Sequence, residues 1–113
     1  MEVLQSCLSG VPLLKVTGEV DHSTAPVLEE SVQKALRVNG RRLLLDLAEC
    51  PYLDSGGLSI LLYALRELRG KGWLGVIAPG PNLLRLFEIV GLTAAPDFCV
   101  FSSSAEAMVA LEC

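Results

Sequence analysis

Residues 43–57 have the sequence LLLDLAECPYLDSGG, which joins an apolar strand, a loop and the start of a helix. The run Leu43-Leu44-Leu45-Asp46-Leu47 is almost continuously apolar. Such a run is typical of a strand buried on both faces, as in the parallel part of a sheet covered by helices. We therefore expect residues 43–47 to form the central strand of an α/β fold.

The segment before this strand predicts a hairpin followed by a helix. Val3–Leu8 and Val11–Val20 are predicted strands, and Ser9-Gly10 between them suits a tight turn. In Ser23-Thr24-Ala25-Pro26 a hydroxyl can cap a helix whose first turn accepts proline. Apolar residues then recur at helical spacing until Asn39-Gly40, which supplies a left-handed residue to end the helix; they are Leu28, Val32, Ala35 and Leu36.

The segment after the central strand predicts three more helices separated by two strands. The strands are residues 74–77 and 98–101. The first helix has an apolar face and is closed by Gly70 and Gly72; that face comprises Leu58, Leu61, Leu62, Leu65 and Leu68. The second ends at Gly91 and turns four side chains inward, Leu83, Leu86, Phe87 and Val90.

The last helix begins at a capping box formed by Ser103 and Glu106, and Met108 and Leu111 give it an apolar side. The predicted order is therefore β-β-α-β-α-β-α-β-α. This order predicts an α/β fold in which helices pack against a mixed sheet through right-handed crossovers.

The length of 113 residues favours a single domain over residues 1–113. Of the residues, 51% are hydrophobic but only 5% are aromatic, so the core must consist mainly of aliphatic side chains. The net charge of −4 opposes binding to nucleic acid, and the basic pair Arg41-Arg42 is interpreted as flanking a strand. No stretch approaches the ~20 apolar residues of a membrane span, and the first residues lack the features of a signal peptide. We therefore expect a cytoplasmic protein that does not insert into membranes.

The chain also lacks the residue patterns of common catalytic and metal sites. Cys7, Cys50, Cys99 and Cys113 are scattered, and His22 is the one histidine, so no zinc site or redox dithiol is expected. We interpret the cysteines as free thiols, mostly small core residues. Neither a Gly-x-Ser-x-Gly elbow nor a Gly-Lys-Ser/Thr phosphate loop is present. The sequence predicts a protein that is not an enzyme and uses no metal or cofactor.

The loop Asp54-Ser55-Gly56-Gly57 is the strongest indication of a functional site. It joins the central strand to a helix start, where ligands of α/β sheets gather and where backbone N–H groups favour negative charge. Two glycines in a first turn each cost about 1 kcal/mol of helix propensity relative to alanine. They indicate either a partner that approaches closely or simply the shape of the turn, with Ser55 as the helix N-cap.

The ordered set of short motifs resembles the STAS family, named for sulfate transporters and anti-sigma factor antagonists. It includes Gly18-Glu19-Val20-Asp21, Thr24-Ala25-Pro26, Leu28-Glu29-Glu30, Leu44-Leu45-Asp46-Leu47, Tyr52-Leu53-Asp54-Ser55-Gly56-Gly57-Leu58, Gly80-Pro81, Leu84-Arg85-Leu86, Gly91-Leu92 and Ser104-Ala105-Glu106-Ala107. The resemblance implies a regulatory module of a bacterial partner-switching pathway, which docks on an anti-sigma factor that is also a serine protein kinase. The alternative that the same resemblance allows is a cytosolic accessory subunit of a membrane transport system. We expect a monomer or a weak homodimer.

In the family members that this chain resembles, the second hydroxyl of an Asp-Ser-Ser/Thr-Gly loop is phosphorylated by that kinase. Matching Asp54 to the family's Asp places Gly56 in the acceptor position, and Gly56 has no hydroxyl. Ser55 is then the remaining phosphoacceptor candidate, although we interpret it first as the helix N-cap. The resemblance therefore implies that the switch is lost or is moved to a neighbouring serine.

The predicted partner-binding surface combines this loop with the preceding Asp21-containing loop and the outer side of the second helix. On a helical wheel Leu58, Leu61, Leu62 and Leu65 face the core, which leaves Ile60 and Tyr63 outward beside Ser59. The surface therefore comprises Asp21, His22, Ser23, Thr24, Asp54, Ser55, Gly56, Gly57, Ser59, Ile60 and Tyr63.

Overall fold

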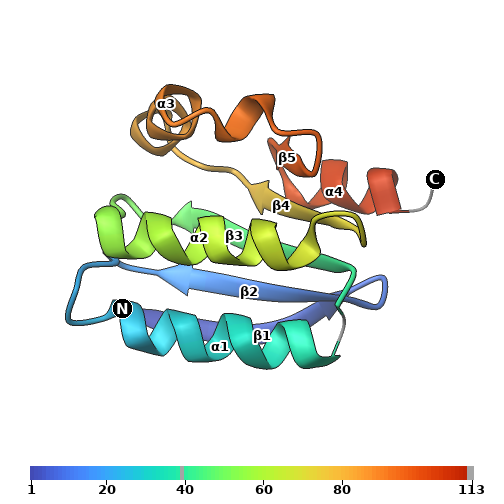
Figure 1. Cartoon of the computed structure of the whole chain (residues 1–113), viewed down its shortest axis with the longest axis horizontal. Coiled ribbons are helices and arrows are strands. Elements are labelled where there is room, and N and C mark those ends of the chain that lie inside the picture. The colour runs from blue at the N-terminus through green and yellow to red at the C-terminus, as the bar shows by residue number, and fades with distance from the viewer. Residues whose placement is uncertain (39, 112–113) are drawn as a thin grey trace.

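A computed structural model describes residues 1–38 and 40–111, so Asn39 and Cys113, which the sequence analysis singled out, lie outside the described residues. Five strands form one mixed sheet in the order β1-β2-β3-β4-β5 (Figure 1). β1 (Glu2–Leu8) is antiparallel to β2 (Val11–Thr17), and β2, β3 (Arg42–Glu49), β4 (Trp73–Ile77) and β5 (Phe98–Phe101) run parallel. The predicted central position of residues 43–47 is confirmed.

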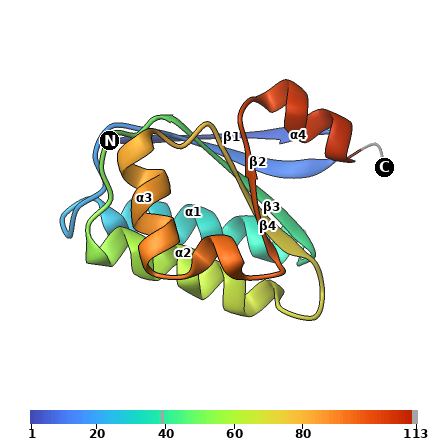
Figure 2. The same cartoon turned by 90° about the horizontal axis from the view of Figure 1, so that it is seen from above.

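The helices cover the two faces of the sheet unequally. α1 (Ala25–Val38), α2 (Ser55–Leu68) and α3 (Pro81–Ile89) lie on one face, and α4 (Ser104–Leu111) lies on the other (Figure 2). The predicted order of helices and strands is confirmed, with a short 3-10 helix η1 (Leu92–Ala94) in addition. Within the described part of the chain, no helix has the length and apolar character needed to cross a membrane.

β3 links the two layers of apolar packing. Leu43, Leu45 and Leu47 lie in the core cluster beneath α1, α2 and α3, whereas Leu44 lies in a second cluster beneath α4. Each of these four side chains is at most 1% exposed. The prediction of a strand buried on both faces is therefore confirmed.

Most turns have the backbone angles that the sequence predicted. Ser9 (φ 51°) and Gly10 (φ 81°) both take left-handed angles, as a two-residue hairpin turn requires, and Gly91 (φ 84°) follows α3. Gly72 permits a close approach of chains, because a Cβ there would lie 1.5 Å from the Arg41 carbonyl oxygen. Gly40 does not take a positive φ, so the predicted left-handed end of α1 does not lie at Gly40.

Several predicted positions need correction. β2 ends at Thr17 rather than at Val20, because Gly18 takes a φ of 93° and breaks the extended chain. Val90 is 41% exposed because it follows α3 as its C-cap residue, where the chain turns away from the core. Met108 is 40% exposed because α4 buries Ala107, so that Met108 is turned about 100° away.

The predicted capping box of α4 is half formed. The Ser103 hydroxyl oxygen accepts the Glu106 N–H at 3.1 Å, as predicted. The Glu106 carboxylate accepts a hydrogen bond from the Ser102 hydroxyl instead of returning to the backbone of Ser103.

Candidate functional site

Two loops at the carboxyl edge of the sheet are joined by backbone hydrogen bonds. The loop 18–24 follows β2 and the loop 50–54 follows β3. The Val20 N–H donates to the Tyr52 carbonyl at 2.9 Å, and the Asp54 N–H donates to the Val20 carbonyl at 3.0 Å. Val20 and Leu53 form an isolated parallel bridge, so the two loops continue the pairing of β2 and β3 as one braced unit.

Asp21 organises the first loop. Its Oδ1 accepts the Ser23 hydroxyl at 2.7 Å and the backbone N–H groups of Ser23 and Thr24 at 3.0 and 3.1 Å. These bonds, led by the Ser23 hydroxyl and the Thr24 N–H, lower the pKa of the Asp21 carboxyl. The Thr24 hydroxyl oxygen accepts the Asp21 N–H at 2.9 Å, so both hydroxyls of Ser23-Thr24, either of which was predicted to cap α1, form hydrogen bonds with Asp21.

Asp54, not Ser55, is the N-cap of α2. The Asp54 Oδ1 accepts the Gly57 N–H at 3.0 Å, and the Asp54 backbone is extended, as N-cap residues require. Ser55 is the first helical residue and is exposed. The prediction that Ser55 caps the helix is therefore wrong, because the carboxyl group one residue earlier accepts the free N–H of Gly57 in its place.

The two glycines of the loop have different surroundings. A Cβ at Gly57 would lie 2.9 Å from Val20 Cγ1 and 3.0 Å from Leu53 Cδ2, so the helix start packs directly on the bridge between the loops. A Cβ at Gly56 would meet only Asp54 Oδ1 at 3.2 Å and Ala25 Cβ at 3.8 Å. Gly56 does not take a positive φ, so its backbone conformation is open to other residues.

The buried face of α2 is rotated relative to the prediction. Ile60 is only 5% exposed, whereas Leu62, predicted to face the core, is 43% exposed. α1 lies alongside α2 (Figure 1), and Ile60 belongs to the core cluster that also contains Ala25 and Leu28 of α1. Ile60 therefore cannot be an outward apolar contact, although Tyr63 is partly exposed and Ser59 is exposed.

A pocket of about 450 Å³ lies between the first turns of α1 and α2. The β2–α1 loop and α1 contribute His22, Ala25, Pro26 and Glu29, and α2 contributes Gly56, Ser59, Ile60 and Tyr63. Both sets have the same spacing of three, four and seven residues; Ala25, Pro26 and Glu29 share one stripe of α1, which His22 precedes in the loop, and the four residues of α2 share one stripe of that helix. Glu29 was not part of the predicted partner-binding surface, although this matching pattern could have revealed it.

A second cavity, also of about 450 Å³, lies on the opposite side of α2, against α3. Ser55 and Leu58 line it together with Leu83 and Leu86 of α3. Ser55 and Gly56 therefore face different cavities, one on each side of α2. The Ser59 hydroxyl, which faces the pocket between α1 and α2, donates to the Ser55 carbonyl at 2.8 Å.

The cysteines differ in environment. Cys50 is buried and its thiol donates weakly to the Tyr52 carbonyl at 3.5 Å; burial raises the pKa of this thiol, and also that of the half-buried Cys99. Cys7 is exposed, so it is not the small core residue that we expected.

Within residues 1–38 and 40–111, no three His, Cys, Asp or Glu side chains are grouped so that they could hold a metal ion.

The chain belongs to the STAS family: the family model described as "Mlab, STAS domain" matches residues 6–100. It is 38% identical over 79 residues to an anti-sigma-B factor antagonist of Listeria monocytogenes, covering 69% of each chain. It is 32% identical over 100 residues to the anti-sigma-F factor antagonist RsfB of Mycobacterium tuberculosis, covering 88% of this chain and 80% of RsfB. The crystal structure of an anti-sigma factor antagonist from Mycobacterium paratuberculosis superposes with a TM-score of 0.85 at 29% identity, covering 99% and 94% of the two chains.

Proposed function

We propose that this chain is an anti-sigma factor antagonist, a cytoplasmic binding module without catalytic activity of its own. Its partner is an anti-sigma factor that is also a serine protein kinase. The 32% identity to RsfB over 88% of this chain carries the proposal. The relatives named above are antagonists by name, so they give the alternative role in a transport system no support.

The docking surface that we propose is the braced pair of loops together with the exposed first turns of α1 and α2. Its accessible members are Asp21, His22, Ser23, Thr24, Asp54, Ser55, Gly56, Ser59 and Tyr63. Gly57 is buried beneath this surface, and Ile60, which is 5% exposed, lies at the bottom of the pocket between α1 and α2. Because hydrogen bonds already fix both loops, little conformational entropy is lost when a partner binds.

We further propose that the antagonist stays in its binding state, because the acceptor position of its relatives is Gly56 here. Ser55 does not replace that acceptor, since its side chain faces the cavity beside α3 rather than the pocket that Gly56 lines. Protein kinases require precise placement of the acceptor hydroxyl, and an error of about 1 Å can cost about 100-fold in rate. Ser55 therefore lies at the edge of the docking surface, and its hydroxyl is displaced from the acceptor position that Gly56 occupies.

Binding to the serine-kinase anti-sigma factor encoded in the same genome tests the first proposal. Isothermal titration calorimetry should give a stable complex for the wild type and at least tenfold weaker binding for Ser59→Arg, which places a bulky cation in the docking surface. Glu88→Arg, on the exposed side of α3, is the matched control and should bind like the wild type. A wild type that binds no such kinase, or equal binding by both variants, would reject the docking proposal.

Intact-mass analysis after incubation with the same kinase and ATP tests the proposed loss of the switch. The wild type and Ser55→Ala should gain no phosphoryl group, whereas Gly56→Ser should gain one of about 80 Da, a measurable change in charge and mass. Rapid modification of the wild type that disappears in Ser55→Ala would show that the switch has moved to Ser55.

A further inference from the structure

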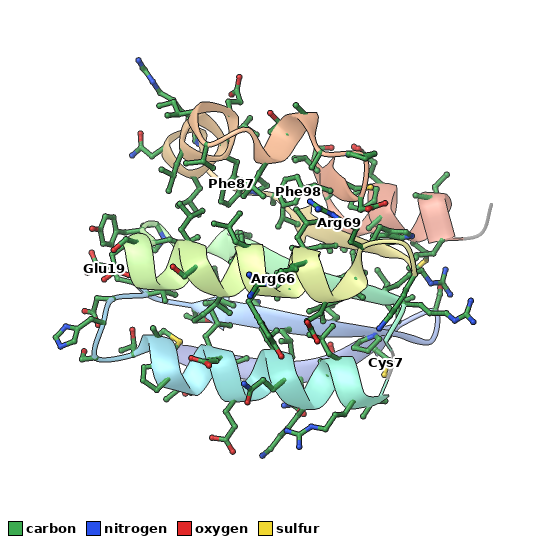
Figure 3. The ribbon with its side chains drawn as sticks, viewed as in Figure 1. Cys7, Glu19, Arg66, Arg69, Phe87 and Phe98 are labelled. Atoms are coloured by element: carbon green, nitrogen blue, oxygen red, sulfur yellow. The ribbon has the colours of Figure 1, made fainter. Side chains whose placement is uncertain are left out.

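The charged side chains are unevenly distributed over the molecule, although Lys15 pairs with Glu49 at 2.8 Å and Glu67 lies between Arg66 and Arg69. Residues 17–33 and 43–65 contain seven carboxylates and no lysine or arginine; the carboxylates are Glu19, Asp21, Glu29, Glu30, Asp46, Glu49 and Asp54. Seven of the nine cationic side chains lie instead in the second halves of α1 and α2, in the turns that follow, or at the first residue of β3; they are Lys34, Arg37, Arg41, Arg42, Arg66, Arg69 and Lys71. Figure 3 shows Glu19 at one end of the molecule and Arg69 toward the other.

Helix dipoles explain part of this separation, because cations are favoured at helix C-termini and carboxylates at N-termini. Glu29 does not fit that explanation, since it lies in the second turn of α1 and lines the pocket between α1 and α2. Its neighbour Glu30 pairs with Lys34 at 3.1 Å and does not line the pocket. The hydrogen bond that Glu29 accepts from Gln33, at 3.5 Å between exposed side chains, is long and weak.

The rest of the pocket lining is mostly apolar. Ala25, Pro26 and Ile60 form its walls, and the partly exposed Tyr63 lies one turn beyond Ser59. Gly56 adds no side chain, and a Cβ there would lie 3.8 Å from Ala25 Cβ, between the two helices. The pocket is thus open at position 56, where the resemblance places the phosphorylated Ser or Thr side chain of related proteins.

We propose that this pocket binds an arginine side chain of the partner protein. The aliphatic stem of an arginine can pack against the apolar walls while its guanidinium remains polar. The guanidinium can pair with the Glu29 carboxylate through parallel hydrogen bonds and stack on the Tyr63 ring. The pocket volume of about 450 Å³ lies within the range of specific binding pockets, about 300–1,000 Å³.

This inference rests on the proposed function, because the arginine belongs to the docked anti-sigma factor. Calorimetry with the serine-kinase anti-sigma factor of the same genome should show Glu29→Gln binding about tenfold more weakly than the wild type, and more so at low salt than at high salt. Glu30→Gln removes the same charge one residue away and should change the affinity less than twofold. Wild-type binding with equal affinities for the two variants would overturn the arginine pocket and leave the proposed function intact.

A titration without the partner tests the pocket by itself. N-acetyl-arginine amide added to the 15N-labelled protein should shift the amide resonances of Gly56, Ser59 and Tyr63, and these shifts should disappear in Glu29→Gln. The neutral analogue N-acetyl-citrulline amide, which has nearly the same shape, should leave the resonances in place. Equal shifts from both compounds, or none from either, would overturn the inference even if no partner had bound.

Discussion

At the scale of single residues, Gly56 and Gly57 differ in what a side chain would meet. Gly57→Ala places a methyl group within about 3 Å of two buried side chains, Val20 and Leu53, and should lower the free energy of unfolding by about 1–3 kcal/mol. Gly56→Ala gains helix propensity worth up to about 1 kcal/mol and meets only the Asp54 carboxylate closely. Urea denaturation followed by circular dichroism measures both changes, and equal effects at the two positions would contradict the packing described here.

The sequence predicted where the functional loop lies but not which residue caps its helix. Asp54 and Ser55 are both good N-cap residues, so local preference alone does not distinguish them. The Val20–Leu53 bridge fixes the helix start, because the Asp54 N–H bonds to the Val20 carbonyl and holds Asp54 outside the helix. That bridge joins segments more than thirty residues apart in the sequence, so no local pattern contains it.

At the scale of elements, the orientation of α2 can be tested with one pair of substitutions. Ile60→Ala removes a side chain that is 5% exposed in the core between α1 and α2, and should lower the free energy of unfolding by about 2–5 kcal/mol. Leu62→Ala removes a side chain that is 43% exposed and should change it by no more than about 0.5 kcal/mol. A larger loss at Leu62, measured by thermal or urea unfolding, would support the helical-wheel prediction instead.

The apolar stripe of α2 predicted the helix but not which side of it is buried. The wheel weighted large aliphatic residues and so included Leu62, whereas small residues show where another chain segment approaches. Gly57 and Ala64 are fully or nearly fully buried on the same side as Ile60. A wheel centred on these small residues would have placed Ile60 in the core, because close packing between elements favours small side chains.

At the scale of the whole molecule, the order of the elements was predictable and their distribution over the two faces was not. Alternation of strands and helices predicts parallel strands with crossovers, which the sheet confirms. No local sequence pattern in residues 104–111 indicates that α4 packs on the face of the sheet opposite α1, α2 and α3. The structure gives the reason, since Ala107 covers Leu44, Ile77 and Phe101, which would otherwise face water.

Because β3 contributes to both apolar clusters, the two faces of the sheet should unfold together. Trp73, the one tryptophan, packs edge-on against Phe101 in the cluster beneath α4, with ring centroids 6.0 Å apart. Far-UV circular dichroism reports mainly on α1, α2 and α3, which contain most of the helical residues of the described chain. The urea transitions followed by Trp73 fluorescence and by circular dichroism should therefore coincide in the wild type.

Ala107→Asp tests this coupling directly. It places a carboxylate at a position that is 0% exposed, which should cost at least about 2 kcal/mol of unfolding free energy. If the faces unfold as one unit, the substitution shifts the fluorescence and circular dichroism midpoints downward by the same amount. Ala110→Asp, at an exposed position of the same helix, should leave both midpoints in place. A fluorescence transition that moves alone would show instead that α4 detaches separately and that β3 does not couple the two faces.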